Sequence, residues 1–300
     1  MRSRIFTAVI AVFLIFAFSN NSWAEGCACN FSTQSDSLIG IGGLEFLMQK
    51  QQDNASPFNA ELRMGGLYDS RVAATSGFSG NEDSDTALVA RLKAGWQAPL
   101  TGNVGLRLDY RGNMDFHKDF NEFNMIDQSL SLEPQYWAGQ FIFSLPLSFN
   151  LTMVDGEHDY NRYAVSPTLA YLIPNTRQAV AIYGIYAQID DRDKDEYMDE
   201  DGVTLGGGCA YLYYFENKSR VRLSLDYQHT TYDALVWQYG TSPSMDKRNN
   251  DAIVAGLDIL FQITEHFGLY VNYAFVHSTS NVAFYEYNRH LVEGGLALKF

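Results

Sequence analysis

The feature that most constrains the fold is a two-residue alternation that runs from residue 58 to the C-terminus. Apolar side chains recur there at every second position, in segments of about ten residues separated by turn-rich stretches. Neighbouring side chains of a β-strand point to opposite faces, so a period of two is the period of a strand. The chain is therefore predicted to be all-β.

Charged residues keep to one of the two faces. In 220–228, Leu223 and Leu225 alternate with Arg222 and Asp226. The same separation holds in 59–68, 88–97 and 104–111. In a barrel that crosses a membrane, one face meets lipid and the other faces the polar interior. This pattern predicts a transmembrane antiparallel up-and-down β-barrel.

Aromatic residues, 14% of the chain, collect near both ends of the segments. Beside the short connections lie Trp96, Tyr136, Trp137, Tyr171, Tyr213, Tyr214, Phe215, Phe261 and Phe267, and toward the long ones lie Tyr110, Tyr163, Tyr186, Tyr227 and Trp237. Aromatic rings favour the two membrane–water interfaces, whereas a soluble sandwich has no reason to gather them at strand ends. Two aromatic girdles are predicted.

Short and long connections alternate along the chain. The long ones are expected near 70–85, 112–122, 154–161, 189–201, 229–249 and 278–284, with five short turns between them. This gives twelve strands, at about 58–69, 86–97, 104–111, 124–136, 140–153, 162–172, 178–188, 203–214, 220–229, 250–261, 267–277 and 286–300. Pro146 and Pro167 fall inside two of them and each removes a ladder donor. Fourteen strands stay an alternative.

The N-terminus has the pattern of a secretory signal peptide. Two arginines precede an apolar stretch, and Ala24 ends a small-residue cleavage motif. We expect residues 1–24 to be removed, residues 25–57 to lie in the periplasm or the lumen, and residues 58–300 to form a barrel in the cell outer membrane. Residues 38–48 could be a strand, a helix or a luminal plug. Lipidation of Cys27 is an alternative that the acidic Glu25 disfavours.

Charge and motifs argue against several function classes. The formal net charge of −14 excludes a basic nucleic-acid-binding surface. No nucleotide loop, metal cluster or cofactor motif is found, so no cofactor and no enzymatic activity are predicted. The acidic loop 190–201 departs from the calcium-loop pattern, and offers at most a weak cation site at Asp191, Asp193 and Asp195.

Charged residues of both signs have the parity of the barrel interior. They are Glu61, Arg63, Arg91, Lys93, Arg107, Asp109, Arg111, Arg222, Asp226, Asp258, Glu293 and Lys299. These side chains could line a water-filled path for small solutes or secreted cargo, or could pair and close the lumen. Twelve strands leave an interior between that of packed eight-stranded barrels and that of open porins. The sequence is compatible both with a porin-like transport protein and with a structural barrel whose lumen is closed.

The C-terminus carries a second export signal. Glu293, Gly295, Leu298 and Phe300 have the spacing of the terminal motif by which the barrel-assembly machinery recognises its clients. That machinery, the lipid of the outer membrane and lipopolysaccharide are the expected partners.

Three stretches resemble a known family. They are residues 66–72 (Gly-Leu-Tyr-Asp-Ser-Arg-Val), residues 273–281 (Tyr-Ala-Phe-Val-His-Ser-Thr-Ser-Asn) and residues 285–289 (Tyr-Glu-Tyr-Asn-Arg), with a closing Gly-x-x-x-x-Phe. Together they resemble the C-terminal barrel of the surface lipoprotein assembly modifier family, which is linked to tetratricopeptide repeats. The resemblance implies a barrel over about 60–300 and a role in moving lipoproteins to the cell surface. The repeat domain is expected to be missing here.

Three histidines, His229, His277 and His290, have the lipid-facing parity near the outer half of their strands. His277 and Thr279 share a face, as the base and nucleophile of an outer-membrane phospholipase would. The order His277-Ser278-Thr279-Ser280-Asn281 departs from the pattern of that enzyme. Polar residues in the headgroup layer are therefore the preferred interpretation, and phospholipase is the third functional alternative.

Overall fold

The computed structural model describes residues 57–71, 84–191, 201–235, 247–282 and 285–300. Its regular structure is β throughout, apart from the short 3-10 helix η2 (Asn121–Phe123). Within these ranges no helix has the length and hydropathy needed to span a membrane. The predicted signal peptide and residues 38–48 lie outside the described ranges.

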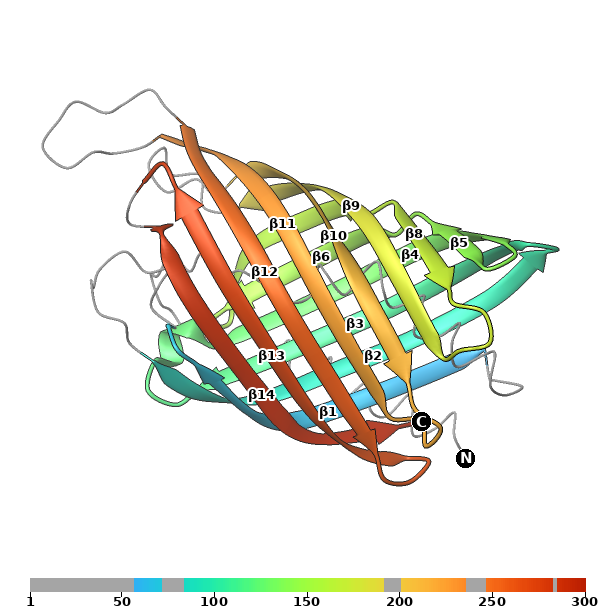
Figure 1. Ribbon diagram of the computed structural model, residues 1–300. Helices are drawn as coiled ribbons and strands as arrows, with labels where there is room; N and C mark the ends of the chain where they lie inside the picture. The colour runs from blue at the N-terminus through green and yellow to red at the C-terminus, as the bar shows by residue number, and fades with distance from the viewer. Residues whose placement is uncertain (1–56, 72–83, 192–200, 236–246, 283–284) are drawn as a thin grey trace, which may run out of the picture.

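The strands form one antiparallel sheet that closes on itself (Figure 1). They are β1 (Phe58–Asp69), β2 (Asp85–Thr101), β3 (Val104–His117), β4 (Met125–Ala138), β5 (Phe141–Ser144), β6 (Leu147–Val154), β7 (Glu157–Val165), β8 (Thr168–Leu172), β9 (Gln178–Asp191), β10 (Gly202–Tyr214), β11 (Arg220–Leu235), β12 (Lys247–Gln262), β13 (Phe267–Ser280) and β14 (Tyr287–Lys299). The last strand pairs with the first, with Leu298 opposite Leu62. This pairing confirms the predicted closed barrel.

The fourteen segments amount to twelve spanning strands. Pro146 separates β5 from β6, and Pro167 separates β7 from β8. β5 and β6 both pair with β4, and β7 and β8 both pair with β9. Each pair of segments is therefore one strand interrupted where proline lacks the N–H that the ladder needs. The predicted count of twelve is confirmed among the described residues.

Three predicted loops differ from the structure. Loops 112–122 and 229–249 are shorter than expected, because β3 runs to His117 and β11 runs to Leu235. Residues 154–161 were expected to form a long connection, but β6 and β7 are joined by the two residues Asp155 and Gly156. Both residues have positive φ, 48° and 82°, as the central residues of a type I′ hairpin turn do. An Asp-Gly pair adopts this turn readily, so the hairpin needs no longer loop.

Exposed and buried side chains alternate along the strands. In β4, Leu130 and Leu132 are exposed, whereas Ser129, Ser131 and Glu133 are buried in the interior. Exposed apolar side chains continue this outer band around the barrel at Leu88, Leu108, Ile182, Leu205, Leu223, Leu225, Ile253, Val271 and Leu296. The outside of the barrel is therefore suited to lipid.

Aromatic rings pair on the outer surface, as at Phe141 with Tyr171, whose ring centroids lie 5.0 Å apart. The prediction is wrong for Trp137, which packs against an inner cluster, and for Tyr214, which is only 1% exposed and belongs to that cluster. The reason for Tyr214 is its inward parity on β10, opposite to that of Tyr213. Trp237 lies outside the described residues.

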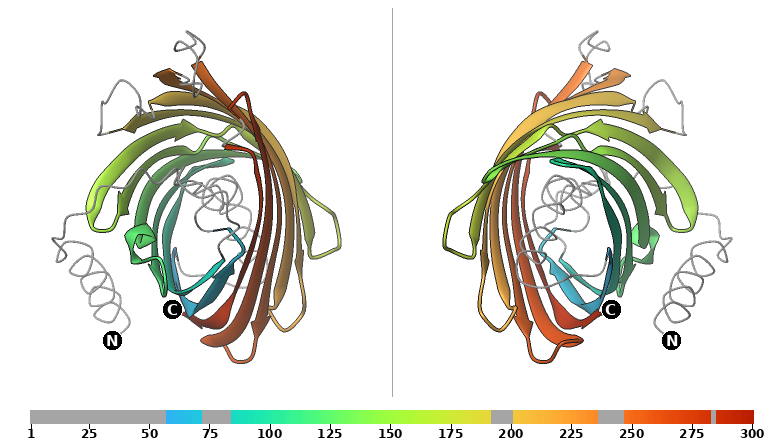
Figure 2. Two further views of the ribbon diagram at one scale, coloured as in Figure 1. Left: turned by 90° about the vertical axis from the view of Figure 1, so that its left-hand side faces the viewer. Right: turned by 90° about the vertical axis from the view of Figure 1, so that its right-hand side faces the viewer.

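The two halves of the interior differ in chemistry. Strands β5 and β7–β10 present mostly apolar side chains inward, among them the alanines Ala164, Ala181 and Ala187 and the larger Leu212. Strands β1–β4 and β11–β14 present most of the buried charges. Figure 2 looks along the barrel and shows β11–β14, in orange and red, on the side opposite the green strands of the apolar group. A solute in the lumen would meet an apolar wall and a charged wall.

Candidate functional site in the barrel interior

Four side chains form an ion-pair cluster near the end that carries the short turns, here called the turn end. Arg63 Nε lies 2.6 Å from Glu61 Oε1, and Arg63 Nη1 lies 2.6 Å from Asp258 Oδ2. Arg220 reaches the same two carboxylates at 3.5 Å each. These contacts join β1 to β11 and β12, although β13 and β14 lie between them in the sheet. The cluster therefore crosses one part of the lumen.

A row of cations lies on the adjoining strands at the same height. Glu61 is paired in register with Lys299 on one side and with Lys93 on the other, and Lys93 is paired with Arg111. Together with Arg63, Arg220 and Arg222, the two lysines place five cations around the two carboxylates of the cluster, and Arg111 lies one strand farther out. The turn end of the charged wall is therefore locally basic, in contrast to the acidic chain as a whole.

A second cluster lies farther from the turn end. Arg91 on β2 pairs with Asp115 on β3, and its Nη2 lies 3.0 Å from Glu293 Oε2 on β14. Because β1 lies between β2 and β14, the contacts of this guanidinium span four consecutive strands, from β14 to β3. Arg107 and Asp109, on the same strand, form a separate pair at 2.6 Å.

Tyr183 and Asp226 meet across an intervening strand. The Tyr183 hydroxyl on β9 donates to Asp226 Oδ1 on β11, and both side chains pass over Gly208 of β10. A Cβ at Gly208 would lie 2.4 Å from the Asp226 carboxylate and 2.8 Å from the Tyr183 hydroxyl. Glycine is thus required here for a close side-chain approach.

The structure places the predicted interior set as follows. Nine members are buried, at Glu61, Arg63, Arg107, Asp109, Arg111, Arg222, Asp226, Asp258 and Glu293, and three are half-buried, at Arg91, Lys93 and Lys299. Sequence reasoning missed Asp115, Glu133 and Arg220, which are also buried. All three have the same inward parity. Glu133 and Arg220 lie inside the predicted strands 124–136 and 220–229, whereas Asp115 lies beyond the predicted end of the strand 104–111, because β3 runs to His117.

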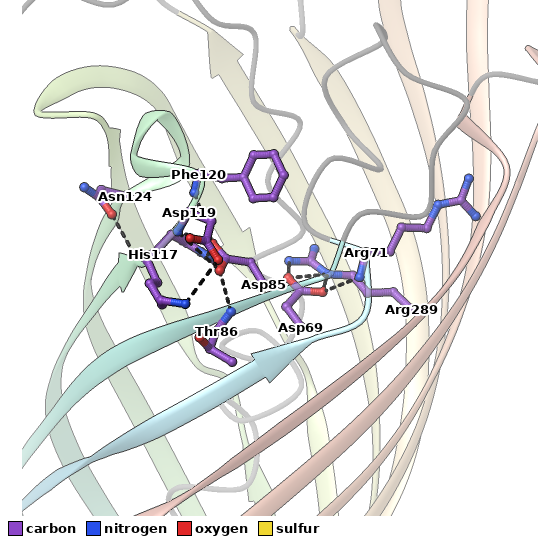
Figure 3. Close-up of polar contacts among 10 residues, drawn as sticks. Asp69, Arg71, Asp85, Thr86, His117, Asp119, Phe120, Asn124 and Arg289 are labelled. Atoms are coloured by element: carbon purple, nitrogen blue, oxygen red, sulfur yellow. Dashed lines mark hydrogen bonds and ion pairs between the residues drawn. The ribbon is translucent and has the colours of Figure 1, made fainter.

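At the opposite end, here called the loop end, a buried carboxylate fastens a loop to the barrel (Figure 3). Asp85 accepts hydrogen bonds from the backbone N–H groups of Thr86, Asp119 and Phe120, and lies 3.3 Å from His117 Nδ1. Burial raises the pKa of Asp85, but these N–H donors and His117 outweigh it and hold the pKa below its usual value. The carboxylate is the first residue of β2, beyond the apolar band that ends near Leu88.

Asp69 plays a similar part at the junction of the first and last strands. Its carboxylate receives two hydrogen bonds from Arg289 Nε, at 3.0 and 3.1 Å, and a further contact from Nη2. The Arg71 backbone N–H also donates to Asp69 at 3.0 Å (Figure 3). Such multiple guanidinium–carboxylate contacts fix geometry as well as adding attraction.

The candidate cation site is only partly described. Asp191 is buried, and its backbone N–H donates to Asp201 Oδ1 at 2.7 Å. Asp193 and Asp195 lie outside the described residues. In the ranges that are described, no group of three or more His, Cys, Asp or Glu residues is arranged to hold a metal ion. Cys209 is a free, exposed thiol on β10, while Cys27 and Cys29 also lie outside those ranges.

The predicted C-terminal signal lies on the closing strand. Phe300 donates its N–H to the Ala60 carbonyl at 2.9 Å and keeps an exposed ring. Gly295 packs so closely on β1 that a Cβ would lie 2.1 Å from the Met64 carbonyl. Glu293 is turned inward to Arg91, and Leu298 pairs with β1 and β13.

The histidines expected on the lipid-facing surface have outward parity on β11, β13 and β14. His277 Nδ1 lies 2.8 Å from Asn288 Oδ1. In the described part of the chain no hydrogen bond joins His277 to Thr279. The arrangement expected of a phospholipase at this pair is therefore not formed.

Comparison with known families gives one match. The model of the family described as surface lipoprotein assembly modifier matches residues 152–293, which run from β6 to β14. The resemblance seen in the sequence is thus confirmed over that part of the chain. No curated protein matches the chain.

Several solved barrels are similar in structure. An outer membrane channel from Pseudomonas putida F1 has 12% identity and a TM-score of 0.49, covering 81% of this chain and 94% of its own. An anion-selective porin from Comamonas acidovorans has 11% identity and a TM-score of 0.42, covering 81% and 98%. The translocator domain of the autotransporter NalP from Neisseria meningitidis has 12% identity and a TM-score of 0.41, covering 90% and 99%. Similarities this distant assign no function.

The closed sheet and its outer apolar band are sufficient to define the class of protein. The chain has the fold and the lipid-facing surface of an outer-membrane β-barrel.

Proposed function

We propose that the protein is a transport barrel that carries small solutes across the outer membrane and favours anions. The observation that carries this proposal is the basic row Lys299, Lys93 and Arg111, which flanks the ion-pair cluster at the turn end. Rings of cationic side chains favour anions in pores. The same wall would repel cations.

Planar-bilayer recordings test the proposal in two steps. Correctly folded protein should give discrete conductance steps, and a salt gradient should give a reversal potential of the sign expected for anion preference. Replacing both Lys93 and Lys299 with glutamine should reduce that preference without abolishing conductance. Lys247→Gln is the matched control, because Lys247 is an exposed residue at the loop end that pairs with Asp233.

Two outcomes count against the proposal in different ways. Folded protein without conductance steps would reject transport of small solutes. If conductance steps are seen but show no anion preference, the role of the basic row is rejected. The same holds if the preference is unchanged in the double variant. In both cases the conclusion that the barrel conducts small solutes is retained.

The family match supports a second candidate function, assembly of lipoproteins at the cell surface. The matched residues 152–293 include most of the apolar inner wall, namely the part formed by β7–β10. A barrel of this kind could act with a closed lumen, held by the ion-pair cluster. Protease treatment of intact cells, with and without the gene, would test it: loss of surface-exposed lipoproteins supports assembly, and unchanged exposure argues against it.

We further propose that the chain reaches the outer membrane by export, removal of residues 1–24 and insertion by the barrel-assembly machinery. The terminal motif and the closing position of β14 support recognition of Phe300 during insertion. Outer-membrane lipid and lipopolysaccharide would then surround the band. Intact mass of the mature protein tests the cleavage site, and Phe300→Ala should lower the amount that reaches the outer membrane.

A further inference from the structure

We propose that Asp251, His229 and Thr231 form an outward-facing site that hydrolyses an acyl ester of a membrane lipid. The three side chains lie on the lipid side of two neighbouring strands, β11 and β12, near the loop end. The site is separate from the lumen and does not depend on the transport proposal.

The side chains form a chain of contacts from acid to hydroxyl. Asp251 Oδ1 lies 2.9 Å from His229 Nδ1, and His229 Nε2 lies 3.4 Å from the Thr231 hydroxyl oxygen. Tyr227 donates its hydroxyl to the same Asp251 oxygen at 2.5 Å and so helps to hold the carboxylate in place. An acid that orients a histidine, which in turn faces a hydroxyl, is the arrangement that activates a nucleophile for acyl transfer.

The sequence positions explain this geometry. His229 and Thr231 are two residues apart on one strand, so both point outward, and Asp251 is the direct cross-strand partner of His229. The Thr231 hydroxyl donates to Asn249 Oδ1 at 2.9 Å, and must turn from Asn249 to His229 for the reaction. Catalytic contacts are often long without substrate and tighten when it binds.

The height of the site on the barrel selects its substrate. Going toward the loop end, the outward side chains of β11 change from Leu223 and Leu225 to Tyr227 and then to His229. Such a change from aliphatic to aromatic to polar marks the boundary between lipid tails and headgroups. Acyl esters of glycerolipids lie at that boundary, so the site would take its substrate from the membrane plane.

The other outward histidines provide an internal comparison. His277 Nδ1 faces the amide oxygen of Asn288, and His290 Nδ1 faces the hydroxyl of Tyr273 at 2.9 Å. Of the three outward histidines in the described residues, only His229 contacts both a carboxylate, that of Asp251, and a hydroxyl, that of Thr231. General interfacial polarity would not distinguish it in this way.

The proposed reaction needs only the lipid and water. The Thr231 oxygen attacks the ester carbonyl while His229 Nε2 takes the hydroxyl proton, which then passes to the leaving alcohol of the lipid. This step forms an acyl–Thr231 ester and breaks the lipid ester bond. Water, activated by His229, then attacks the acyl–Thr231 ester, and the products are a fatty acid, a lysolipid and the free hydroxyl.

Release of fatty acid from a phosphatidylethanolamine probe in detergent micelles tests the proposal with the full mature chain. Thr231→Val and His229→Ala should each reduce the rate by about 100-fold or more. Thr231→Ser should retain activity because it keeps the hydroxyl. A fluorophosphonate should label Thr231, as mass spectrometry of the peptide that contains it would show.

His277→Ala is the matched control and should keep the full rate, because His277 shares the outward parity and lies near the same end of the barrel. Heat-dependent gel mobility confirms that each variant is folded. The proposal is overturned if folded wild-type protein releases no fatty acid and takes up no label. It is also overturned if Thr231→Val keeps the wild-type rate, or if His277→Ala loses as much as His229→Ala.

Discussion

Replacing Asp258 with asparagine should destabilise the barrel more than any change to a surface ion pair. The carboxylate contacts Arg63 at 2.6 Å and Arg220 at 3.5 Å, and all three side chains are at most 4% exposed. At an effective dielectric constant of about 20, Coulomb's law gives about 6 kcal/mol for the shorter contact. Rehydration and the remaining attraction to Glu61 reduce this, and broken buried pairs typically cost about 3–5 kcal/mol.

Unfolding by urea of the protein inserted in lipid vesicles, followed by tryptophan fluorescence, measures this cost. Asp233→Asn is the control, because Asp233 and Lys247 form an ion pair in which both side chains are 55% exposed. Exposed pairs contribute about 0–1 kcal/mol, so the control should unfold near the wild-type midpoint. Equal midpoints for the two variants would refute the claim that the cluster is a buried, mutually dependent unit.

Three further predictions concern the loop end and the interior. Asp85→Asn should loosen the loop that follows β3, seen as faster hydrogen exchange at residues 117–124; unchanged exchange would refute the role of the carboxylate. The pKa of Asp85 is lower in the folded state than in the unfolded state. The stabilisation that this carboxylate gives the loop is therefore present above the unfolded-state pKa of about 3.8, and it is lost as the pH falls through the folded-state pKa. Exchange of the same amides should therefore be flat from pH 7 to pH 5, after correction for the intrinsic rate, and rise below about pH 4. Gly208→Val should force Tyr183 and Asp226 apart and lower the unfolding midpoint, whereas Gly66→Val, with no atom within 4 Å of its added Cβ, should not.

The barrel could be predicted because alternation is a local property. Every charge in 220–228 shares one parity, and the structure turns that parity inward. The same rule placed Arg63 and Asp258 on the inner face. It could not show that they meet, since 195 residues separate them and their contact depends on how the barrel closes.

Other features were not predicted from the sequence, for identifiable reasons. The Asp155-Gly156 pair is a known sequence signal for a two-residue hairpin turn. The prediction of a long loop here relied on the polarity of the stretch alone and overlooked this signal. The alanine-rich inner wall could not be predicted from the pattern of any single strand, because alanine is compatible with either face of a barrel strand. The contact of His229 with Asp251 depends on the register of β11 with β12, which the spacing of His277 and Thr279 could not reveal.

The two interrupting prolines have a mechanical consequence. Pro146 and Pro167 lie in neighbouring strands, and the Ser166 N–H donates to the Pro146 carbonyl at 3.0 Å, so both breaks occur at one height. Here two adjacent strands lack N–H donors at the same level, so the hydrogen-bond ladder is interrupted in both strands at once. A barrel wall with such a shared break is most compliant along that line, so any widening of the cross-section to admit a bulky passenger should begin there.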